Sequence, residues 1–220
     1  MKNKYEIFIS NIVNNNILQC PICKSSLTIL NHELICANNH DFTISKKGAL
    51  FLVNSSNFKN SLIYNTSLFQ KRRQFINKNY YNLVYDEIAK FINSMSKNII
   101  NILDLGSGEG THMHKILERV NKNWNLVSID YSKDAINLAT DYTKNNICIV
   151  GDINNLPLVD RSIDVVVDFL SPFNNEEIKR VLKDNGIIIK ITPGNKYLNE
   201  LRQLLKIDDY SKKEEIKHNF

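Results

Sequence analysis

The amino-acid sequence predicts an α/β fold in which a doubly wound parallel sheet follows a small metal-binding module. Two observations lead to this prediction. Short apolar runs alternate with helical stretches from residue 99 onward, as in chains that build βαβ units. Three cysteines and a histidine lie within residues 20–40 at a spacing that is typical of zinc ligands. A chain of 220 residues is long enough for one ordinary domain and a small appendage.

The expected parallel sheet lies in the second half of the chain. A continuous apolar strand, such as residues 163–170 apart from its acids, belongs to a sheet that is covered on both faces. Helices are expected between the strands, and residues 69–92 also show helical spacing of apolar side chains. The expected strands are residues 99–105, 125–129, 147–150, 164–170 and 186–191.

A glycine-rich loop follows the first expected strand. The whole chain has only seven glycines, and Gly106, Gly108 and Gly110 fall within five residues. The backbone there must either turn sharply or let a ligand approach closely, which makes a nucleotide-like cofactor the natural candidate. The spacing from Asp104, Asp-x-Gly-x-Gly-x-Gly, differs from that of dinucleotide enzymes. It resembles the first motif of class I S-adenosylmethionine-dependent methyltransferases.

Acidic residues end the first three expected strands. Asp130 lies twenty residues beyond Gly110, where a doubly wound fold places the carboxylate that holds ribose hydroxyls. Asp152 follows the third strand, where its carboxylate could accept a hydrogen bond from an adenine amino group. Any one of Asp104, Asp130 and Asp152 could be a simple turn former. Three in register with the glycine loop favour a cofactor site.

The predicted metal site has the spacing C-x2-C, twelve residues, then C-x3-H. Two ligands on each of two tight turns close a tetrahedron around one zinc ion, so its role is structural. Four cysteines without an export signal favour ligands or buried thiols over disulfides. His32 could compete as a ligand, and Cys148 in the third strand is expected to be a core thiol. The predicted ligands are Cys20, Cys23, Cys36 and His40.

The overall composition is that of an ordinary soluble protein, with 43% hydrophobic and 23% charged residues and a net charge of +5. No apolar run approaches the length needed to cross a bilayer. Glu6 and the Asn-rich residues 11–16 interrupt any signal-peptide core, so a cytoplasmic location is expected.

The positive charge is concentrated in one segment. Residues 42–85 contain seven Lys or Arg, interleaved with aromatic rings, and no Asp or Glu. Such a segment suits the phosphates and unstacked bases of RNA. The alternative is a solvated linker whose rings pack on the next domain. The RNA-binding candidates are Lys71, Arg72, Arg73 and Tyr80.

Several motifs occur together in one known family. Residues 20–23 (Cys-Pro-Ile-Cys), 35–42 (Ile-Cys-Ala-Asn-Asn-His-Asp-Phe) and 46–52 (Lys-Lys-Gly-Ala-Leu-Phe-Leu) resemble the zinc module of the 23S ribosomal RNA guanine-N1 methyltransferases. Residues 70–75 (Gln-Lys-Arg-Arg-Gln-Phe), followed by Tyr80 and Tyr81, resemble that family's inter-domain helix. The resemblance covers about residues 20–205. Later motifs follow in the same order at residues 103–110, 156–157, 171–172 and 192–194.

The resemblance implies a class I, Rossmann-like methyltransferase domain with a structural zinc in its N-terminal module. It implies that the domain binds S-adenosylmethionine, with Tyr81 touching this cofactor, and methylates N1 of a guanine in a 23S rRNA hairpin. The expected parts are an N-terminal extension (1–19), a zinc-binding module (20–57), a basic and aromatic linker with a helix (58–98), the methyltransferase domain (99–205) and a charged tail (206–220). The expected cofactor-binding residues are Tyr81, Asp104, Gly106, Gly108, Glu109, Gly110, Asp130, Asp152, Ile153 and Tyr197.

The chain departs from the family in three places. Tyr197 stands where members carry a histidine near the cofactor, and Asp168 stands where they commonly show a basic residue beside the transfer site. Only residues 206–220 follow the expected helix at 197–205, too few for the last two strands of a complete sheet. The sheet is therefore expected to be C-terminally shortened, and its open fifth strand favours pairing into a homodimer.

Guanine N1 carries a proton that must leave at or near methyl transfer, so the reaction needs an acceptor. Asp168, expected at the mouth of the fourth strand, is the candidate base. Alternatively it is a turn residue or a solvent-facing acid. Two other functions stay open. A small-molecule methyltransferase with a stabilising zinc appendage would turn over without RNA, and a non-catalytic module would bind cofactor and RNA without methylating it.

Overall fold

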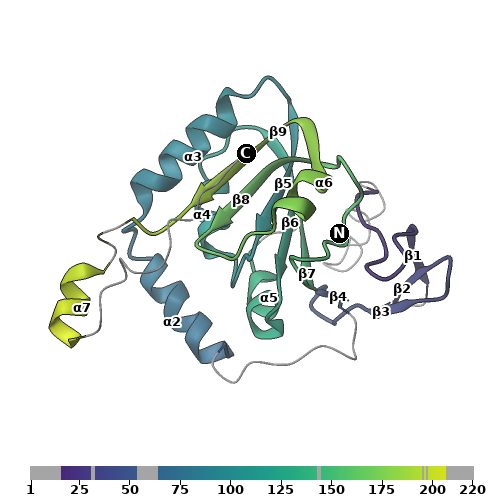
Figure 1. Cartoon of the computed structure of the whole chain (residues 1–220), viewed down its shortest axis with the longest axis horizontal. Helices are drawn as coiled ribbons and strands as arrows, with labels where there is room; N and C mark the ends of the chain where they lie inside the picture. The colour runs from purple at the N-terminus through teal and green to yellow at the C-terminus, as the bar shows by residue number, and fades with distance from the viewer. Residues whose placement is uncertain are drawn as a thin grey trace, which may run out of the picture. The chain divides into compact units, whose positions relative to one another are not determined.

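The protein is described by a computed structural model, shown in Figure 1, over residues 16–30, 33–53, 64–142, 145–194, 196 and 198–206. The chain divides into two compact units, residues 1–190 and 191–220. The smaller unit contains helix α7 (Asn199–Leu205). The larger unit contains both sheets except for the last residue of the final strand, and it carries the site.

A small antiparallel sheet opens the described chain, with the strand order β1-β2-β3. Its strands are β1 (Leu27–Leu30), β2 (Glu33–Cys36) and β3 (Asp41–Thr43). Side chains alternate between the two faces of such a sheet, and Leu34 pairs with Phe42 across β2 and β3. Both are buried, so one face of this sheet packs against the rest of the unit.

The large sheet has six strands in the order β4-β7-β6-β5-β8-β9. The five strands predicted from the sequence are all present, and β9 forms one edge. The sixth, β4, was not predicted, because a strand of three residues carries no measurable periodicity. It pairs in parallel with β7. The strands are β4 (Leu50–Leu52), β5 (Ile99–Leu105), β6 (Asn123–Asp130), β7 (Asn146–Gly151), β8 (Ile163–Phe169) and β9 (Leu182–Ile191).

Helices follow three of these strands: α4 (Thr111–Leu117), α5 (Lys133–Ala139) and α6 (Asn175–Val181). Right-handed crossovers place α4 and α5 on one face of the sheet and α6 on the other. The helical stretch expected at 69–92 is two helices, α2 (Thr66–Ile76) and α3 (Asn82–Ser94). Asn79 separates them with a left-handed φ of 65°, which ends a helix. Helix α2 packs on α5, and α3 packs on α4.

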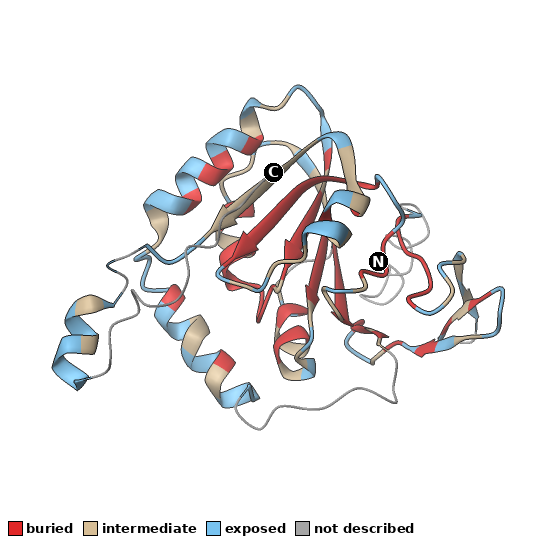
Figure 2. Ribbon diagram, in the orientation of Figure 1, coloured by how far each residue is buried: buried red, intermediate tan, exposed pale blue. Residues whose placement is uncertain are grey.

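The two faces of the large sheet have different covers. On one face, Val150 of β7 packs with Ala139 of α5. On the other face, Ile149 joins a large apolar cluster that also contains Leu34 and Phe42 of the small sheet. Figure 2 shows the buried strands of the sheet, of which β7 and β8 are buried along their whole length. The small sheet therefore packs into the main hydrophobic core and does not form a separate domain.

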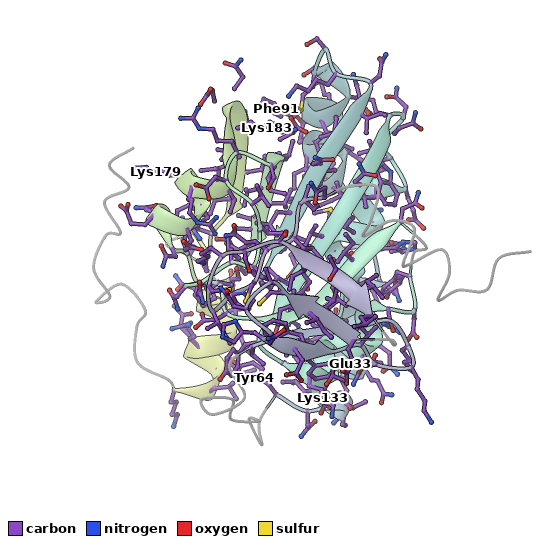
Figure 3. The ribbon with its side chains drawn as sticks, turned by 90° about the vertical axis from the view of Figure 1, so that its right-hand side faces the viewer. Glu33, Tyr64, Phe91, Lys133, Lys179 and Lys183 are labelled. Carbon is purple, nitrogen blue, oxygen red and sulfur yellow. The ribbon has the colours of Figure 1, made fainter. Side chains whose placement is uncertain are left out.

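The connection from β7 to β8, residues 152–162, contains turns and no helix. The chain just before the small sheet runs along it instead. Leu18 forms an antiparallel bridge with Leu158. The Gln19 N–H donates to the Pro157 carbonyl (3.0 Å), and Val159 N–H donates to Ile17 (2.8 Å). Figure 3 views this side of the unit, with the small sheet in the foreground. The N-terminal module thus takes the place that a crossover helix fills in a regular βαβ unit.

The described helices include none that is long and apolar enough to span a membrane.

Because the small antiparallel sheet and the large parallel sheet share one core, we predict that they unfold together. Leu52 in β4 is buried between them, so Leu52→Ala should lower the free energy of unfolding by about 2 to 5 kcal/mol. Thermal unfolding should remain a single transition at a lower temperature. Leu83→Ala on α3 is the matched control, because Leu83 is 83% exposed and should cost little. A normal transition for the sheet beside a separate, earlier one for the small module would contradict the shared core.

Candidate functional site

The predicted metal ligands converge on one point. Cys20 and Cys23 come from the turn before β1, Cys36 ends β2 and His40 precedes β3. Their ligand atoms all lie within 4.8 Å of one another. Sγ of Cys36 is 3.6 Å from Sγ of Cys23 and 3.3 Å from Nδ1 of His40. Zinc bonds of about 2.0 to 2.3 Å in a tetrahedron require such separations, so the donor set fits zinc.

The surroundings of the cluster favour the thiolate at Cys23 and Cys36, whereas burial raises the pKa of Cys20. The backbone N–H groups of Ile22 and His40 donate to Sγ of Cys20 (3.4 Å) and Cys36 (3.3 Å). A hydrogen bond with the Ser25 hydroxyl, 3.0 Å from Sγ, lowers the pKa of Cys23 to about 5. Thiolate is the form that binds metal. His32, the competing ligand, lies outside the described residues.

The glycine loop lies where ligands bind in open α/β sheets. The chain runs from β5 toward β6 on one side and returns to β8 on the other, so the strand order reverses at β5. Gly106, Gly108 and Gly110 all have positive φ, between 56° and 79°. A Cβ on Gly106 would lie 2.4 Å from Cβ of Ser171, the second residue after β8. Only glycine allows the loops after β5 and β8 to approach so closely.

Asp130 holds the glycine loop in place. One carboxylate oxygen accepts from the Gly108 N–H (2.9 Å), and the other accepts from the Ser132 N–H (2.7 Å). Burial raises the pKa of Asp130, and these two hydrogen bonds oppose the shift. The predicted ribose ligand therefore also links the loops after β5 and β6. A carboxylate oxygen has two lone pairs, so these bonds leave acceptor capacity for a ligand hydroxyl.

Two further acids at the carboxyl end of β5 have a buried oxygen that accepts no hydrogen bond. They are Asp104 of β5, through Oδ2, and Glu109 of the glycine loop, through Oε2, which has Nε of Arg72 as an ion-pair partner at 3.9 Å. Burial, together with the charges of Asp130, Glu109 and Asp168, raises the pKa of Asp104 well above its usual value. A buried acid oxygen without a hydrogen bond is costly, and a cation relieves the cost, as Arg72 does in part for Glu109. S-adenosylmethionine carries a sulfonium and an ammonium, so the residues present fit this cofactor.

Aromatic rings close the site on the α3 and α4 side. Tyr81 makes edge contacts with His112 (5.2 Å between centroids) and Phe169 (5.6 Å), and these two rings stack at 3.8 Å. The Tyr85 hydroxyl is 2.7 Å from Nδ1 of His112. Burial lowers the pKa of His112 to about 3, so its ring is neutral. Tyr81 thus lies beside the second residue of α4, just after the glycine loop, and its contact with the cofactor stays a prediction.

The loop after β7 contains Asp152 and Ile153. Oδ1 of Asp152 accepts from the Asn154 N–H (2.8 Å), and Ile153 packs against the main core. Asn155, two residues after Ile153, donates to the Pro21 carbonyl (2.8 Å) and accepts from Lys24 (2.5 Å). Pro21 and Lys24 of the metal-binding turn therefore hold the loop that carries Asp152, the residue predicted to bind adenine. Tyr197 lies outside the described residues.

Asp168 is not the solvent-facing acid that the alternative interpretation expected, because it is fully buried. Its Oδ1 accepts from both the N–H and the hydroxyl of Ser171 (2.9 Å each). Its Oδ2 accepts from Nζ of Lys190 (2.5 Å), which comes from β9. Leu170, with a φ of 62°, turns Ser171 back onto the carboxylate. Three donors of the chain occupy Asp168, which suits a positioning role better than that of a free base.

The RNA-binding candidates separate into two groups. Lys71 and Tyr80 are exposed. Arg72 leans over the glycine loop, with Nη1 3.5 Å from the Cβ position of Gly108. Arg73 joins α2 to α5, donating to the Leu138 carbonyl (2.8 Å).

The sequence spacing of α2 indicates the direction in which Arg72 and Arg73 point. Phe69, Arg72, Arg73 and Ile76 recur at the spacing of one helix face, and Phe69 and Ile76 are buried. The aliphatic stems of both arginines follow that face, so charge alone does not give the direction in which these side chains point. Lys190 carried no comparable signal, because its partner Asp168 is distant in the sequence.

Two family models match the chain. The model described as "Methyltransferase domain" matches residues 96–219, and the zinc-ribbon model described as "RlmA, N-terminal" matches residues 18–61. The first covers more than half of the chain and the second covers the metal-binding turns.

Two relatives extend over most of the chain. The Bacillus subtilis protein named "Putative 23S rRNA (guanine-N(1)-)-methyltransferase YxjB" is 34% identical over 203 residues, 89% of this chain and 71% of the relative. The Streptomyces fradiae 23S rRNA (guanine(748)-N(1))-methyltransferase is 25% identical over 199 residues, 88% of this chain and 70% of the relative.

A solved structure supports the fold. The Methanococcus maripaludis protein named "putative s-adenosyl-l-methionine-dependent methyltransferase" matches with a TM-score of 0.51 and 22% identity, over 67% of this chain and 73% of its own. At this identity the likeness shows the fold alone. With the family models, it confirms the predicted class I methyltransferase fold with an N-terminal zinc ribbon, and with it the predicted S-adenosylmethionine and zinc.

The cluster geometry predicts one zinc ion per chain. Protein purified without added metal should contain it, and Cys20→Ser combined with Cys36→Ser should remove it, because two of four ligands are lost. Elemental analysis measures both. Cys148→Ser is the control, since Cys148 is a buried core thiol of β7, as predicted, and the variant should keep its zinc. Metal retained after the double substitution would refute the ligand set.

The raised pKa of Asp104 predicts opposite effects of Asp104→Asn on stability and binding. Between the unfolded and the folded pKa of this acid the folded state holds more protons, so stability falls as pH rises through that window. The variant removes this cost and should melt at a higher temperature than wild type near neutral pH. Its affinity for S-adenosylmethionine should fall about tenfold or more, the scale of one charge-assisted hydrogen bond.

Scanning calorimetry and titration calorimetry measure the two effects. Asp184→Asn, at an exposed position outside the site, should change neither. A variant that melts below wild type, or binds the cofactor equally well, would contradict the assignment of Asp104.

Proposed function

The chain belongs to the family of 23S rRNA (guanine-N1)-methyltransferases, which join a zinc ribbon to an S-adenosylmethionine-dependent methyltransferase domain, and we propose that it methylates N1 of a guanine in 23S rRNA. The observation that supports this proposal most is the placement of Asp104 and Glu109. Each has a buried carboxylate oxygen that accepts no hydrogen bond, Asp104 at the end of β5 and Glu109 in the glycine loop, at the switch point of the sheet. A cationic nucleoside cofactor is the ligand that this loop fits.

In the proposed reaction the chain aligns the reactants and excludes water. When bound, S-adenosylmethionine supplies a methyl group on a sulfonium. Gly106, Gly108 and Gly110 would give it backbone access, Asp130 would hold the ribose, and Asp152 with Ile153 would hold the adenine. Glu109 and Asp104 would lie at its positively charged end, with Tyr81 and Tyr197 beside it.

The zinc ribbon would act through structure alone. Its four ligands leave no open coordination position, so we assign it no step in the reaction. Its contacts with the loop after β7 would hold that half of the cofactor site.

The RNA would approach from the exposed side of α2 and the turn after it. Lys71 and Tyr80 offer a charge for phosphate and a ring for stacking on an unpaired base. Arg72, 41% exposed, would reach the RNA only past the cofactor loop, and Arg73 serves chiefly to hold α2 on α5.

The proposed activity predicts a reverse-transcription stop. A methyl group on N1 blocks the Watson–Crick edge, so primer extension on 23S rRNA should halt one nucleotide before the modified guanine. Deleting the gene should abolish the stop. A wild-type copy should restore it, and a copy with Asp104→Ala should not. Absence of any gene-dependent stop would favour a small-molecule acceptor or a module that binds RNA without methylating it.

The exposed pair predicts a change in salt dependence. Lys71→Ala should weaken rRNA binding at all sequences and reduce the slope of log affinity against log salt by about one. Tyr80→Ala should weaken binding with little change in slope, because stacking releases no counterions. Lys90→Ala on α3 is the control at a comparably exposed lysine. Filter-binding titrations at several salt concentrations measure the slopes, and identical slopes for Lys71→Ala and wild type would remove this surface from the proposal.

A further inference from the structure

We propose that Lys190, held by Asp168 at the carboxyl ends of β8 and β9, is a catalytic residue that binds the O6 oxygen of the target guanine and stabilises the charge that forms there. This inference rests on the proposed function and adds to it a group that handles the acceptor base. The glycine loop handles the cofactor, but no residue assigned above contacts the guanine ring at the transfer site.

The position of Lys190 follows from the switch point of the sheet. Asp130, on the β6 side, bonds Gly108 and fixes the cofactor loop. The acceptor must therefore approach from the other side of β5, over the carboxyl end of β8. Ser171 lies there, with its hydroxyl oxygen also 2.8 Å from the Leu105 carbonyl oxygen and its Cβ against Gly106. Lys190 and Ser171 both donate to the Asp168 carboxylate. Because Ser171 contacts Gly106, the Lys190 ammonium lies near the glycine loop.

The burial of this ion pair indicates function rather than stability. Asp168 has no exposed surface and the Lys190 side chain is 14% exposed, with Nζ 2.5 Å from Oδ2. Removing two charges from water costs about as much as their attraction returns, so a buried pair is poor evidence of a stabilising role. A buried charge pair beside the loop at the switch point, where ligands bind in such sheets, is a candidate functional group. The left-handed backbone of Leu170, a strained conformation for this residue, occurs in the same turn.

The same two strands carry a second pair that serves as a comparison. At the other end of β8 and β9, Lys183 bonds Asp164 (2.9 Å), which Lys97 also bonds. There Lys183 is 33% exposed and Lys97 44% exposed, and no glycine loop lies nearby. Figure 3 labels Lys183 near the end of the unit away from the zinc ribbon. The two pairs share their strands and chemistry and differ in their distance from the cofactor loop.

The donors of Lys190 are only partly used by the chain. An ammonium has three N–H donors. Asp168 accepts one, and the Ser171 carbonyl, at 3.4 Å, is a long second contact. The ring of Phe173 lies 4.5 Å from Nζ. A carbonyl oxygen of a flat, aromatic ligand can complete this shell, with Phe173 beside the ring that carries it.

Methylation of guanine N1 requires that the N1 proton leave and that the carbon–sulfur bond of the cofactor break. The N1 proton passes to a water molecule, and the charge left on the guanine is shared by N1 and O6. The N1 lone pair then forms the bond to the methyl carbon, while the carbon–sulfur electron pair goes to sulfur and leaves a neutral thioether. Lys190 stays protonated and donates to O6 throughout. A fixed donor aimed at an oxygen where charge develops typically contributes about 100-fold or more in rate.

Asp168 acts through Lys190 and is a positioning residue. Its Oδ1 is fixed by the two donors of Ser171, so Oδ2 holds the ammonium in one place. A lysine side chain has a long flexible stem, and such anchoring keeps the charge from leaving for solvent.

The test compares Lys190→Met, Lys190→Arg and Asp168→Asn with the control Lys183→Met, all in the full chain. Radiolabelled S-adenosylmethionine and 23S rRNA from a gene-deletion strain are the substrates, and primer extension identifies the methylated atom. We expect Lys190→Met to lower kcat about 100-fold with KM within about threefold, and Lys190→Arg to restore most of the rate. Asp168→Asn should lower kcat by about tenfold, and Lys183→Met should leave it unchanged.

The pH profile separates a catalytic from a structural role. Without the cation at O6, loss of the N1 proton depends on the pH of the solution. The rate of Lys190→Met should therefore rise more steeply than that of wild type between about pH 7 and 9. Its affinity for the cofactor, measured by calorimetry without RNA, should equal that of wild type.

The outcomes separate the inference from the function on which it rests. Wild-type activity on guanine N1 with a Lys190→Met variant that matches it in kcat and pH profile would overturn the role of Lys190 alone. Equal losses in Lys190→Met and Lys183→Met would do the same, because they would indicate a general effect of the β8–β9 edge. A wild-type protein without activity on 23S rRNA would overturn the proposed function and this inference with it.

Discussion

One apolar core joins the zinc ribbon to the methyltransferase sheet, and the arrangement of the site depends on it. Leu34 and Phe42 of the ribbon pack in the same cluster as Ile149 of β7, on the face where the β7–β8 connection has no helix. A parallel sheet is stable only when both faces are covered. The ribbon supplies that cover, and β4 extends the sheet from the same segment. A module this small cannot bury enough apolar surface to fold unaided, so its metal ligands stabilise the core of the whole larger unit.

The zinc ribbon also contacts the loop after β7, which is part of the predicted cofactor site. Asn155 bonds the metal-binding turn at Pro21, three residues after Asp152. The glycine loop is held from the other side by Asp130. Between these two anchors lie buried carboxylate oxygens of Asp104 and Glu109 that accept no hydrogen bond, which destabilises the protein without ligand. Binding sites for charged ligands are often destabilising in the absence of the ligand, and the packed elements around them supply the stability.

The parts of the fold that the sequence predicts well depend on local patterns. The five long strands follow from continuous apolar runs, and the metal ligands follow from spacing within two turns. The parts that it misses depend on partners distant in the chain. Strand β4 is too short to show a period, and Asp168 looks like a surface acid until Lys190 is placed beside it. The charge of Arg72 and Arg73 predicts an RNA-binding surface. The two arginines share a face of α2 with buried Phe69, and their side chains extend toward the glycine loop and α5. A charge pattern gives the sign of a segment but not the face on which it lies.

Hydrogen–deuterium exchange before and after zinc removal tests most directly whether the ribbon is part of the cofactor site. With a chelator present, exchange should increase in the ribbon and also in residues 152–159 and 106–110, while the N-terminal ends of β5 and β6 keep their protection. Adding S-adenosylmethionine to the zinc-loaded protein should protect residues 106–110 and 152–155. Increased exchange confined to residues 17–44, with unchanged protection of both loops, would contradict a site that depends on the ribbon.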